Sequence, residues 1–362
     1  MEQITLDKAI KEIGPLDGAA VRRAEARQSS LTKPPGSLGR LEDVSVQLAG
    51  IFATEKPQIR GKVVIVAAAD HGVVAQGVTG YPQEVTTQMV RNFLRGSAAV
   101  SVMSSLLGVR QIIVDAGIAN HIQHHPDLRT TCAGRGTCDI TRGPAMSAQQ
   151  AELCVTAGVN LALEAAGSGA DLIATGDMGI GNTTPASAIT AAITGRSPEE
   201  TTGRGTGRTP DQLERKIEVV RRALEVNRPD RHDPLNLLEK VGGFEIGVLA
   251  GVVLGGAMMR RAVVLDGFIS GAAALLAQLL CPAARDYMIA SHRSEERGHQ
   301  AVLSHLKLFP LLDLGMRLGE GTGAVLAMPI IEAAAACLAR MATFDEAGVT
   351  DRDRKTRPEE GQ

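Results

Sequence analysis

Glu320 stands between two glycines in the stretch RLGEGTGAVLA, residues 317–327, directly before a long apolar run. A glycine on each side keeps the carboxylate close to the backbone, where another molecule can approach it. In a cavity with little water, the pKa of such a carboxyl rises toward neutrality, which suits a general base. An acid at the start of a helix that faces the helix dipole has the same pattern. Both interpretations stay open from the residues alone.

A second stretch whose residues could do chemistry is GDMGIGNTTPASAI, residues 176–189. It follows a strand-like segment and opens a helix-like segment at Pro185. Its glycines let the backbone approach a ligand, and free N–H groups at a helix start bind anions. The spacing differs from the dinucleotide pattern GxGxxG, and no lysine follows the last glycine as in a P-loop. We therefore predict binding of a single phosphate, with a tight turn and a Thr cap as the alternative. The candidate residues are Gly176, Gly179, Gly181, Asn182, Thr183 and Thr184.

Three further segments carry weaker signals. TTGRGTGRTP, residues 201–210, is a second Gly/Thr/Arg loop before a helix, and Lys216 beyond it adds charge or belongs to a solvated face. Asp70 and His71 follow a strand-like run and favour a structural role over acid–base chemistry. No His or acid cluster has the spacing of helical metal ligands, so no metal is predicted.

The composition excludes several classes of protein. The 362 residues carry a net charge of −2 and no dense basic patch, which disfavours nucleic-acid binding. Five cysteines, an odd number, argue against a disulfide framework. The longest apolar run, near 246–259, is shorter than the ~20 residues that span a bilayer. We expect a soluble cytoplasmic protein without a nucleic-acid or membrane partner.

The elements that must position these residues alternate between strand and helix. Apolar β-branched runs predict buried parallel strands over 62–70, 110–117, 171–177 and 262–267, with a weaker fifth over 287–291. Helical patterns cover 84–107, 147–166, 210–227 and 243–259. The alternation predicts an α/β fold with a doubly wound, mainly parallel, Rossmann-like sheet. In such a sheet, ligands bind at the carboxyl ends of the strands, where the candidate loops and Asp266 lie.

The two ends of the chain contain helical patterns without strands. We predict a small helical domain from residues 1–56 plus 298–350, an α/β nucleotide-binding domain over 57–297 and a charged tail over 351–362.

Taken together, the motifs resemble one family. LTKPPGSLGRLE (31–42), ADHGV (69–73), GYPQEVT (80–86), GNTTP (181–185), KVGGFEIG (240–247), LDGF (265–268) and RLGEGTGAVLAMPI (317–330) occur in order. This set resembles the nicotinate-nucleotide–dimethylbenzimidazole phosphoribosyltransferase family from about residue 5 to residue 345. The resemblance implies transfer of phosphoribose from nicotinate mononucleotide to 5,6-dimethylbenzimidazole, giving α-ribazole 5′-phosphate and nicotinate in cobalamin lower-ligand synthesis. It implies no cofactor and no metal.

The resemblance also assigns roles to residues. Glu320 matches the general base, and inversion at the anomeric carbon follows from attack opposite the leaving group. The phosphate and ribose contacts correspond to Gly176, Asp177, Gly179, Gly181, Asn182, Thr183, Thr184, Gly203 and Gly205, with Asp266 and Ser291 at the same end of the sheet. Lys216 matches a lysine that reaches the phosphate from the partner subunit of a homodimer. Tyr81, Gln88, Met89 and Leu318 fall where the azole pocket is expected.

One departure affects Asp177, where relatives are expected to have the longer glutamate; a bridging water can fill the gap. Two other hypotheses compete with phosphoribosyl transfer. A nicotinamide-dependent oxidoreductase is disfavoured because the GxGxxG fingerprint is missing. A nucleotide-binding regulator without turnover would bind a mononucleotide and be indifferent to loss of Glu320.

Overall fold

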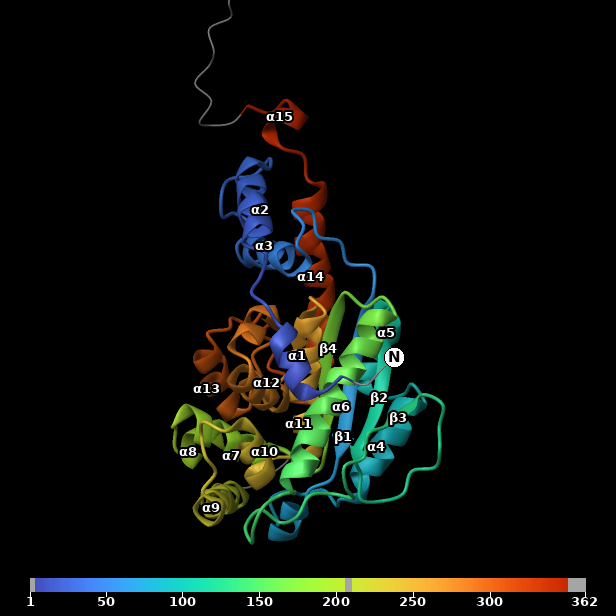
Figure 1. Cartoon of the computed structure of the whole chain (residues 1–362), viewed down its shortest axis with the longest axis vertical. Coiled ribbons are helices and arrows are strands. Elements are labelled where there is room, and N and C mark those ends of the chain that lie inside the picture. Colours follow the sequence, from blue (N-terminus) through green and yellow to red (C-terminus); the bar gives the residue numbers. More distant parts are fainter. Residues whose placement is uncertain (1–3, 206–209, 351–362) are drawn as a thin grey trace, which may run out of the picture. The chain divides into compact units, whose positions relative to one another are not determined.

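The computed structural model describes residues 4–205 and 210–350. Its centre is one sheet of six strands in the order β3-β2-β1-β4-β5-β6, with every neighbouring pair parallel. The strands are β1 (Lys62–Ala69), β2 (Arg110–Gly117), β3 (Leu128–Thr130), β4 (Leu172–Met178), β5 (Ala262–Leu265) and β6 (Met288–Ala290). This is the strand order of the doubly wound Rossmann fold. The predicted fold class is confirmed (Figure 1).

The central strands are apolar along their whole length because helices cover both faces of a parallel sheet. In β1, every residue from Val63 to Ala69 is buried. The strand order reverses between β1 and β4, which pair from Lys62↔Leu172 to Ala68↔Met178. The carboxyl ends of these strands therefore flank the crevice at which ligands bind in such sheets.

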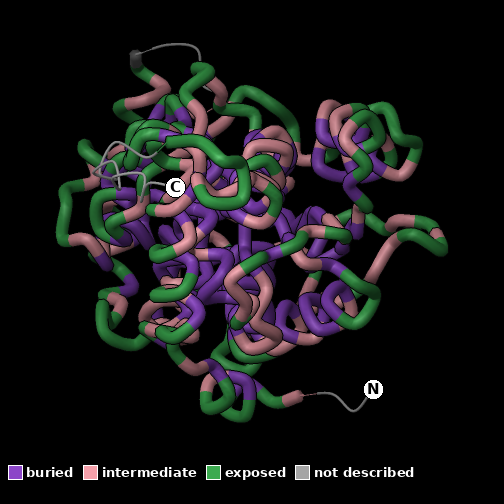
Figure 2. The backbone as a smooth tube through the Cα atoms, turned by 90° about the horizontal axis from the view of Figure 1, so that it is seen from above, coloured by how far each residue is buried: buried purple, intermediate pink, exposed green. Residues whose placement is uncertain are grey.

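Helices α6 (Ala148–Gly167) and α11 (Phe244–Met258) form the most intimate helix pair and pack on the sheet (Figure 1). They approach so closely that a Cβ on Gly158 would lie 1.9 Å from the Val248 carbonyl oxygen. Helix α1 (Leu6–Glu12) packs against this pair and buries Leu6 and Ala9. In Figure 2, the buried stretches run through the middle of this part of the molecule, while the loops around it are exposed.

The other helices of this part are α4 (Glu84–Leu94), α5 (Ala99–Leu107), α7 (Thr183–Thr194), α8 (Pro198–Thr201), α9 (Pro210–Asn227), α10 (Pro234–Val241), α12 (Phe268–Leu280) and α13 (Arg297–Leu306). Two short 3-10 helices, η1 (Gly72–Gln76) and η2 (Pro282–Tyr287), complete it. Helices α4 and α5 pack on β1 and β2, and α12 packs on β4 and β5.

The chain divides into two compact units. The larger comprises the residues up to Pro15 and Arg60–Pro329, and the smaller comprises Leu16–Ile59 and the residues from Ile330 onward. The smaller unit contains α2 (Gly18–Ser30), α3 (Arg40–Phe52), α15 (Phe344–Ala347) and most of α14 (Thr322–Arg340). Its core is formed by Ala24, Ala49 and Leu338, with Val46 packed against them.

These boundaries differ from the predicted domains, although a small helical unit is built from both ends of the chain. Helix α1 packs on α6 and α11, and α13 packs on α7 and α12, so both belong to the larger unit. Helical periodicity identifies a helix but not the partner that buries its apolar face. The predicted charged tail, 351–362, lies outside the described residues.

Two predicted elements also differ in detail. The helix expected over 84–107 is two helices, α4 and α5, separated at Gly96, whose φ of +74° ends the first. The three-residue strand β3 was not predicted, because so short a segment carries no apolar run.

Helix α14 meets the length and hydropathy criteria for a membrane span, whereas the longest apolar run in the sequence was placed near 246–259. Because 56% of its most apolar window is buried and core helices of soluble proteins meet the same criteria, this is weak support for a membrane span.

Candidate active site

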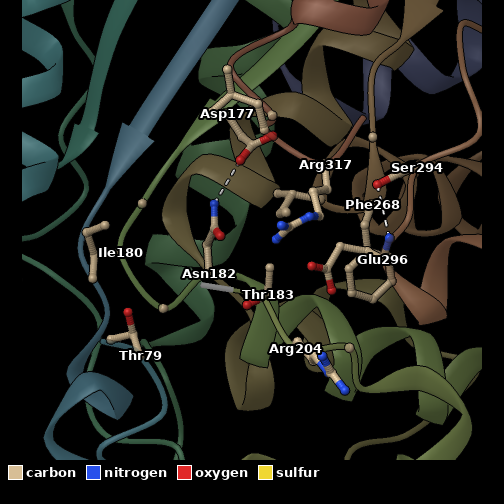
Figure 3. Close-up of a pocket in the computed structure, with 18 of the residues that line it drawn as sticks. Thr79, Asp177, Ile180, Asn182, Thr183, Arg204, Phe268, Ser294, Glu296 and Arg317 are labelled. Carbon is tan, nitrogen blue, oxygen red and sulfur yellow. Dashed lines mark hydrogen bonds between the residues drawn. The ribbon is translucent and has the colours of Figure 1, made fainter. Parts of the chain in front are cut away.

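A cavity of about 1160 Å³ opens beyond the carboxyl ends of β4, β5 and β6 in the larger unit (Figure 3). Its walls come from the segments that follow these three strands, from the loop around Gly203 and from residues 317–320. A further wall comes from the segment between Thr79 and Met89. The position agrees with the expectation for ligands in a doubly wound sheet.

Most of the predicted site residues meet at this cavity. It is lined by Tyr81, Met89, Asp177, Gly179, Gly181, Asn182, Thr183, Gly203, Gly205, Leu318 and Glu320. Five others are buried next to lining residues without lining the cavity themselves: Gly176, Thr184, Lys216, Asp266 and Ser291. Gln88 lies on an exposed position of α4 and is not part of the lining.

The loop between β4 and α7, for which the sequence predicted anion binding, lines one end of the cavity, called here the anion loop. Gly181 has a φ of +90°, and a Cβ on Gly179 would lie 2.6 Å from the Ala69 carbonyl oxygen, so both positions favour glycine. The helix begins at Thr183, two residues before the predicted start at Pro185. Thr183, the first residue of α7, lines the cavity, and a helix N-terminus at a cavity wall is an arrangement that binds phosphate.

Lys216 adds a positive charge to this end. Its ammonium donates a hydrogen bond to the Thr183 hydroxyl at 2.6 Å and to the Gly203 carbonyl at 3.4 Å. Burial lowers the pKa of Lys216 to about 8, while the nearby Glu296 opposes the shift. The lysine that the resemblance assigns to a partner subunit therefore comes, in this structure, from the same chain as the loop that it contacts. Thr206 and Gly207, the rest of the GRGTG loop, lie outside the described residues.

Glu320 lies in a backbone conformation that is unusual for its residue type. Its φ is +63°, and the adjacent Gly319 and Gly321 have φ values of +83° and +94°. The side chain is buried, and one of its oxygens accepts a hydrogen bond from the Val100 amide at 3.4 Å, near the start of α5. Burial raises the pKa of Glu320, and the charge of Asp266 adds to the rise. A buried carboxyl with a raised pKa at a cavity wall is suited to accept a proton.

Asp266 performs the capping role that was an alternative for Glu320. Its carboxylate accepts hydrogen bonds from the amides of Gly321, Gly323 and Ala324 at 3.1, 2.8 and 3.1 Å. These groups belong to the first turn of α14, where a carboxylate satisfies free N–H groups and faces the positive end of the dipole. Asp266 thus fixes the start of the helix that follows Glu320. Ser291 donates in turn to the Asp266 backbone carbonyl at 3.3 Å.

Asp177 is a third buried carboxyl at this end of the sheet. One oxygen accepts a hydrogen bond from the Asn182 side chain at 2.9 Å, as Figure 3 shows, and its backbone carbonyl accepts the Glu320 amide at 3.2 Å. Burial raises the pKa of Asp177 well above its ordinary value, and the charges of neighbouring acids, Asp266 foremost, add to this rise. Asp177 therefore connects the anion loop to the backbone of Glu320.

Part of the cavity lining is apolar. Tyr81, Val85, Met89 and Leu318 form this part, and Tyr81 and Leu318 are 46% and 58% exposed. Large apolar side chains exposed at a cavity mouth provide the surface that a flat aromatic ligand covers.

His71 and Glu245 form a buried ion pair behind the anion loop. Their side chains lie 2.8 Å apart, and both are almost fully buried. Burial lowers the pKa of His71, but the charge of Glu245, its hydrogen bond to the ring and the charge of Asp70 together outweigh this effect, so the pKa is raised. A Cβ on Gly179 would lie 3.1 Å from the His71 ring. Neither side chain lines the cavity, which agrees with the structural role that was favoured for the Asp70–His71 pair.

Several lining residues were not singled out from the sequence: Thr79, Arg204, Phe268, Ser294, Glu296 and Arg317 (Figure 3). Arg317 stands in the same motif as Glu320, so the sequence indicated its segment although not the residue itself. Glu296 belongs to the segment SHRSEERGHQ, which resembles an ordinary helix start. Within residues 4–205 and 210–350, no group of three or more His, Cys, Asp and Glu side chains has the geometry of a metal site.

The parallel sheet, the helix N-terminus beside a buried lysine, the apolar lining residues and the buried carboxyl of Glu320 define the chain as an α/β protein with a cavity at the carboxyl ends of its strands. Comparisons with known proteins agree. A family model described as phosphoribosyltransferase matches residues 13–349. The chain is 56% identical over 345 residues to the nicotinate-nucleotide–dimethylbenzimidazole phosphoribosyltransferase of Roseiflexus sp. strain RS-1, covering 95% of this chain and 98% of the relative.

The same enzyme of Desulforudis audaxviator is 53% identical over 345 residues, 95% of this chain and 98% of the relative. A crystal structure of the Thermus thermophilus enzyme superposes with a TM-score of 0.89 at 46% identity, covering 93% of this chain and all of the other. The chain belongs to the nicotinate-nucleotide–dimethylbenzimidazole phosphoribosyltransferase family, and it is an enzyme of the phosphoribosyltransferase class.

Proposed function

We propose that this enzyme transfers phosphoribose from nicotinate mononucleotide to 5,6-dimethylbenzimidazole, giving α-ribazole 5′-phosphate and nicotinate for the lower ligand of cobalamin. The names of its relatives describe an enzyme that acts on these two compounds. The observation that carries the mechanism is the buried carboxyl of Glu320, which lines the same cavity as the helix N-terminus of α7.

In this proposal, the 5′-phosphate binds at the N-terminus of α7. The backbone of Gly181 and Thr183 at the start of α7 and the Lys216 charge would hold it there. A phosphate beside Lys216 favours the charged form of the lysine, which burial alone disfavours. Binding energy at the phosphate then positions the ribose for attack.

The acceptor base lies against the apolar wall formed by Tyr81, Met89 and Leu318. Its unprotonated ring nitrogen attacks the anomeric carbon from the face opposite nicotinate, so the β-nucleotide becomes an α-product. The C–N bond to nicotinate breaks, and its electron pair neutralises the pyridinium nitrogen. The N–H proton of the azole passes to the Glu320 carboxylate, whose raised pKa makes it a competent acceptor.

No metal is required in this proposal because the pyridinium group is already an activated leaving group. The residues need only hold the phosphate, orient the azole and take one proton. Held geometry supplies much of the rate enhancement in such a transfer.

A product assay tests the proposal. The parent enzyme and Glu320→Gln are mixed with nicotinate mononucleotide and dimethylbenzimidazole in the presence of EDTA. We expect α-ribazole phosphate from the parent and a decrease of about 100-fold or more in the variant, the contribution typical of a positioned base. Glu152→Gln on the exposed side of α6 serves as the matched control and should retain full activity.

The outcomes separate reaction from mechanism. No product from the parent, with or without EDTA, would contradict the transfer itself. Product formation undiminished in Glu320→Gln would leave the reaction but remove the general base. Activity that EDTA abolishes would contradict a mechanism without metal.

We further propose a cytoplasmic homodimer, a proposal that rests on the family resemblance and on the cysteine pattern. Sedimentation equilibrium of the purified protein tests the dimer, and cell fractionation tests the location. A monomer at assay concentration would contradict the first proposal.

A further inference from the structure

Glu296 is a cavity-lining carboxylate to which the mechanism above gives no role. It precedes α13, and its side chain is 7% exposed. Within the described part of the chain, neither carboxylate oxygen has a hydrogen-bond or ion-pair partner, and Oε2 is fully buried. Buried carboxylate oxygens without hydrogen-bond partners are rare because desolvating them is costly. Such a group in a binding cavity indicates a partner supplied by the ligand.

The position of Glu296 is fixed relative to the anion loop. A Cβ on Gly203 would lie 2.1 Å from Oε2, so the carboxylate rests on the Gly203 backbone. The Gly203 carbonyl accepts a hydrogen bond from Lys216, which also bonds Thr183. Figure 3 shows the carboxylate pointing into the cavity near Thr183 and the Arg317 guanidinium. Arg317 forms no ion pair with it among the described residues, so the carboxylate oxygens stay available.

The chemistry of the group restricts its ligand. An ionised carboxylate only accepts hydrogen bonds, and it repels a phosphate. In a mononucleotide whose phosphate occupies the N-terminus of α7, the nearest donors beyond the phosphate are the ribose hydroxyls. Carboxylates bind ribose hydroxyls in the same way at the dinucleotide sites of related sheets.

We propose that Glu296 accepts hydrogen bonds from the ribose hydroxyls of the mononucleotide and thereby selects ribose over deoxyribose. This inference rests on the proposed function, since it assumes the mononucleotide substrate. Its carboxylate and the Lys216 ammonium would then hold the two polar parts of one ligand, hydroxyls and phosphate, from neighbouring positions.

The test combines a change in the enzyme with a change in the substrate. The ratio of kcat/KM for nicotinate mononucleotide to that for its 2′-deoxy and 3′-deoxy analogues is measured in the parent, in Glu296→Gln and in Glu296→Ala. We expect the parent to prefer the ribonucleotide and Glu296→Ala to lose about tenfold or more of that preference for at least one analogue. This is the size expected for a hydrogen bond to a charged group. Glu296→Gln, which keeps one acceptor, should lose less.

Glu295→Gln is the matched control, because Glu295 is the adjacent acid, lines the same cavity and is exposed. It should keep the parental preference. Because each ratio is taken within one variant, a loss of folded protein cancels from it. If a variant is too slow to assay, the same ratio is taken from dissociation constants.

An unchanged ratio in Glu296→Ala would overturn the inference, even if total activity falls, because a purely structural support of Gly203 affects all three substrates equally. A parent that does not turn over nicotinate mononucleotide would instead overturn the proposed function, so the two failures are distinguishable.

Discussion

Glu320 combines two properties that oppose folding. Its backbone has a φ of +63°, a conformation that costs on the order of 1–3 kcal/mol for a residue other than glycine. Its carboxyl is buried near Asp266, which disfavours the charged form. The flanking glycines allow the turn, and the cap that Asp266 places on α14 holds it. Residues kept in such a conformation cluster at functional sites.

The raised pKa of Glu320 predicts how stability depends on pH. Because the folded state binds this proton more tightly than the unfolded state, its contribution is present below the ordinary pKa of 4.5 and is lost as pH rises through the raised value. Glu320→Gln cannot lose this contribution. We therefore expect the melting temperature of the variant, relative to that of the parent, to increase as the pH is raised from below 4.5 toward neutrality.

Melting curves of parent and variant over that range check the prediction. Asp177 also has a raised pKa, and the charge of Glu320 is one of its causes, so the variant lowers the pKa of Asp177 and the gain in melting temperature increases in the same direction. A difference in melting temperature that does not depend on pH would contradict the prediction.

At the scale of single residues, most of the residues that the sequence predicted for the site line the cavity, because glycines and small polar residues at strand ends have few structural explanations. Glu320 could be singled out by its two glycine neighbours. Glu296 could not, because its significance depends on the missing partner and on its contact with Gly203, which lies far away in the chain. The capping role of Asp266 likewise depends on a helix that begins more than fifty residues later.

At the scale of elements, strand β4 fixes the position of the Glu320 backbone relative to the sheet. A Cβ on Gly176 would lie 2.4 Å from the Glu320 carbonyl oxygen and 2.9 Å from the Gly321 amide nitrogen. Both atoms are backbone, so they can move away only if the turn itself shifts. Gly176 therefore brings the strand and the turn into contact without being part of the cavity surface.

We predict that Gly176→Ala reduces kcat by about 100-fold, the effect of displacing a reacting group by about 1 Å. The change should lower the affinity for nicotinate mononucleotide less than it lowers kcat, because the anion loop follows Asp177 in the chain. Steady-state kinetics measure both. Gly143→Ala, where an added Cβ meets nothing within 4 Å, is the control and should behave as the parent. Equal turnover by the two variants would contradict the predicted positioning.

The elements themselves were predicted unevenly, for physical reasons. Long apolar strands such as β1 and β2 were predicted within a residue of their bounds, because burial on both faces demands continuous β-branched sequence. The break between α4 and α5 was missed because the apolar pattern continues through Gly96. The periodicity of apolar residues indicates which residues are buried, and a short turn between two helices does not interrupt it.

At the scale of the molecule, the cavity lies entirely in the larger unit, and the smaller unit has its own core around Leu338. Leu338 is fully buried there. Replacing it by alanine removes apolar contacts and leaves a cavity, which costs about 2–5 kcal/mol. We predict that Leu338→Ala lowers the thermal stability while kcat and KM stay near the parental values well below the melting temperature.

Differential scanning calorimetry and steady-state kinetics on the same preparation check this prediction. An early unfolding step in the scan would report the smaller unit melting before the rest. A changed KM in a variant that is still folded would contradict the assignment of catalysis to the larger unit alone.

The sheet ends on both sides in strands of three residues, β3 and β6. A long, flat edge strand offers a row of unpaired N–H and C=O groups that another chain can extend into an aggregate. Here the long strands are all interior, and the Ser291 and Ala290 carbonyls next to the β6 edge already accept the Leu311 amide. Strand β3 was not predicted, and strand β6 carried the weakest signal. These two short edge strands thus protect an alanine- and valine-rich sheet from edge-to-edge aggregation with other protein molecules in a crowded solution.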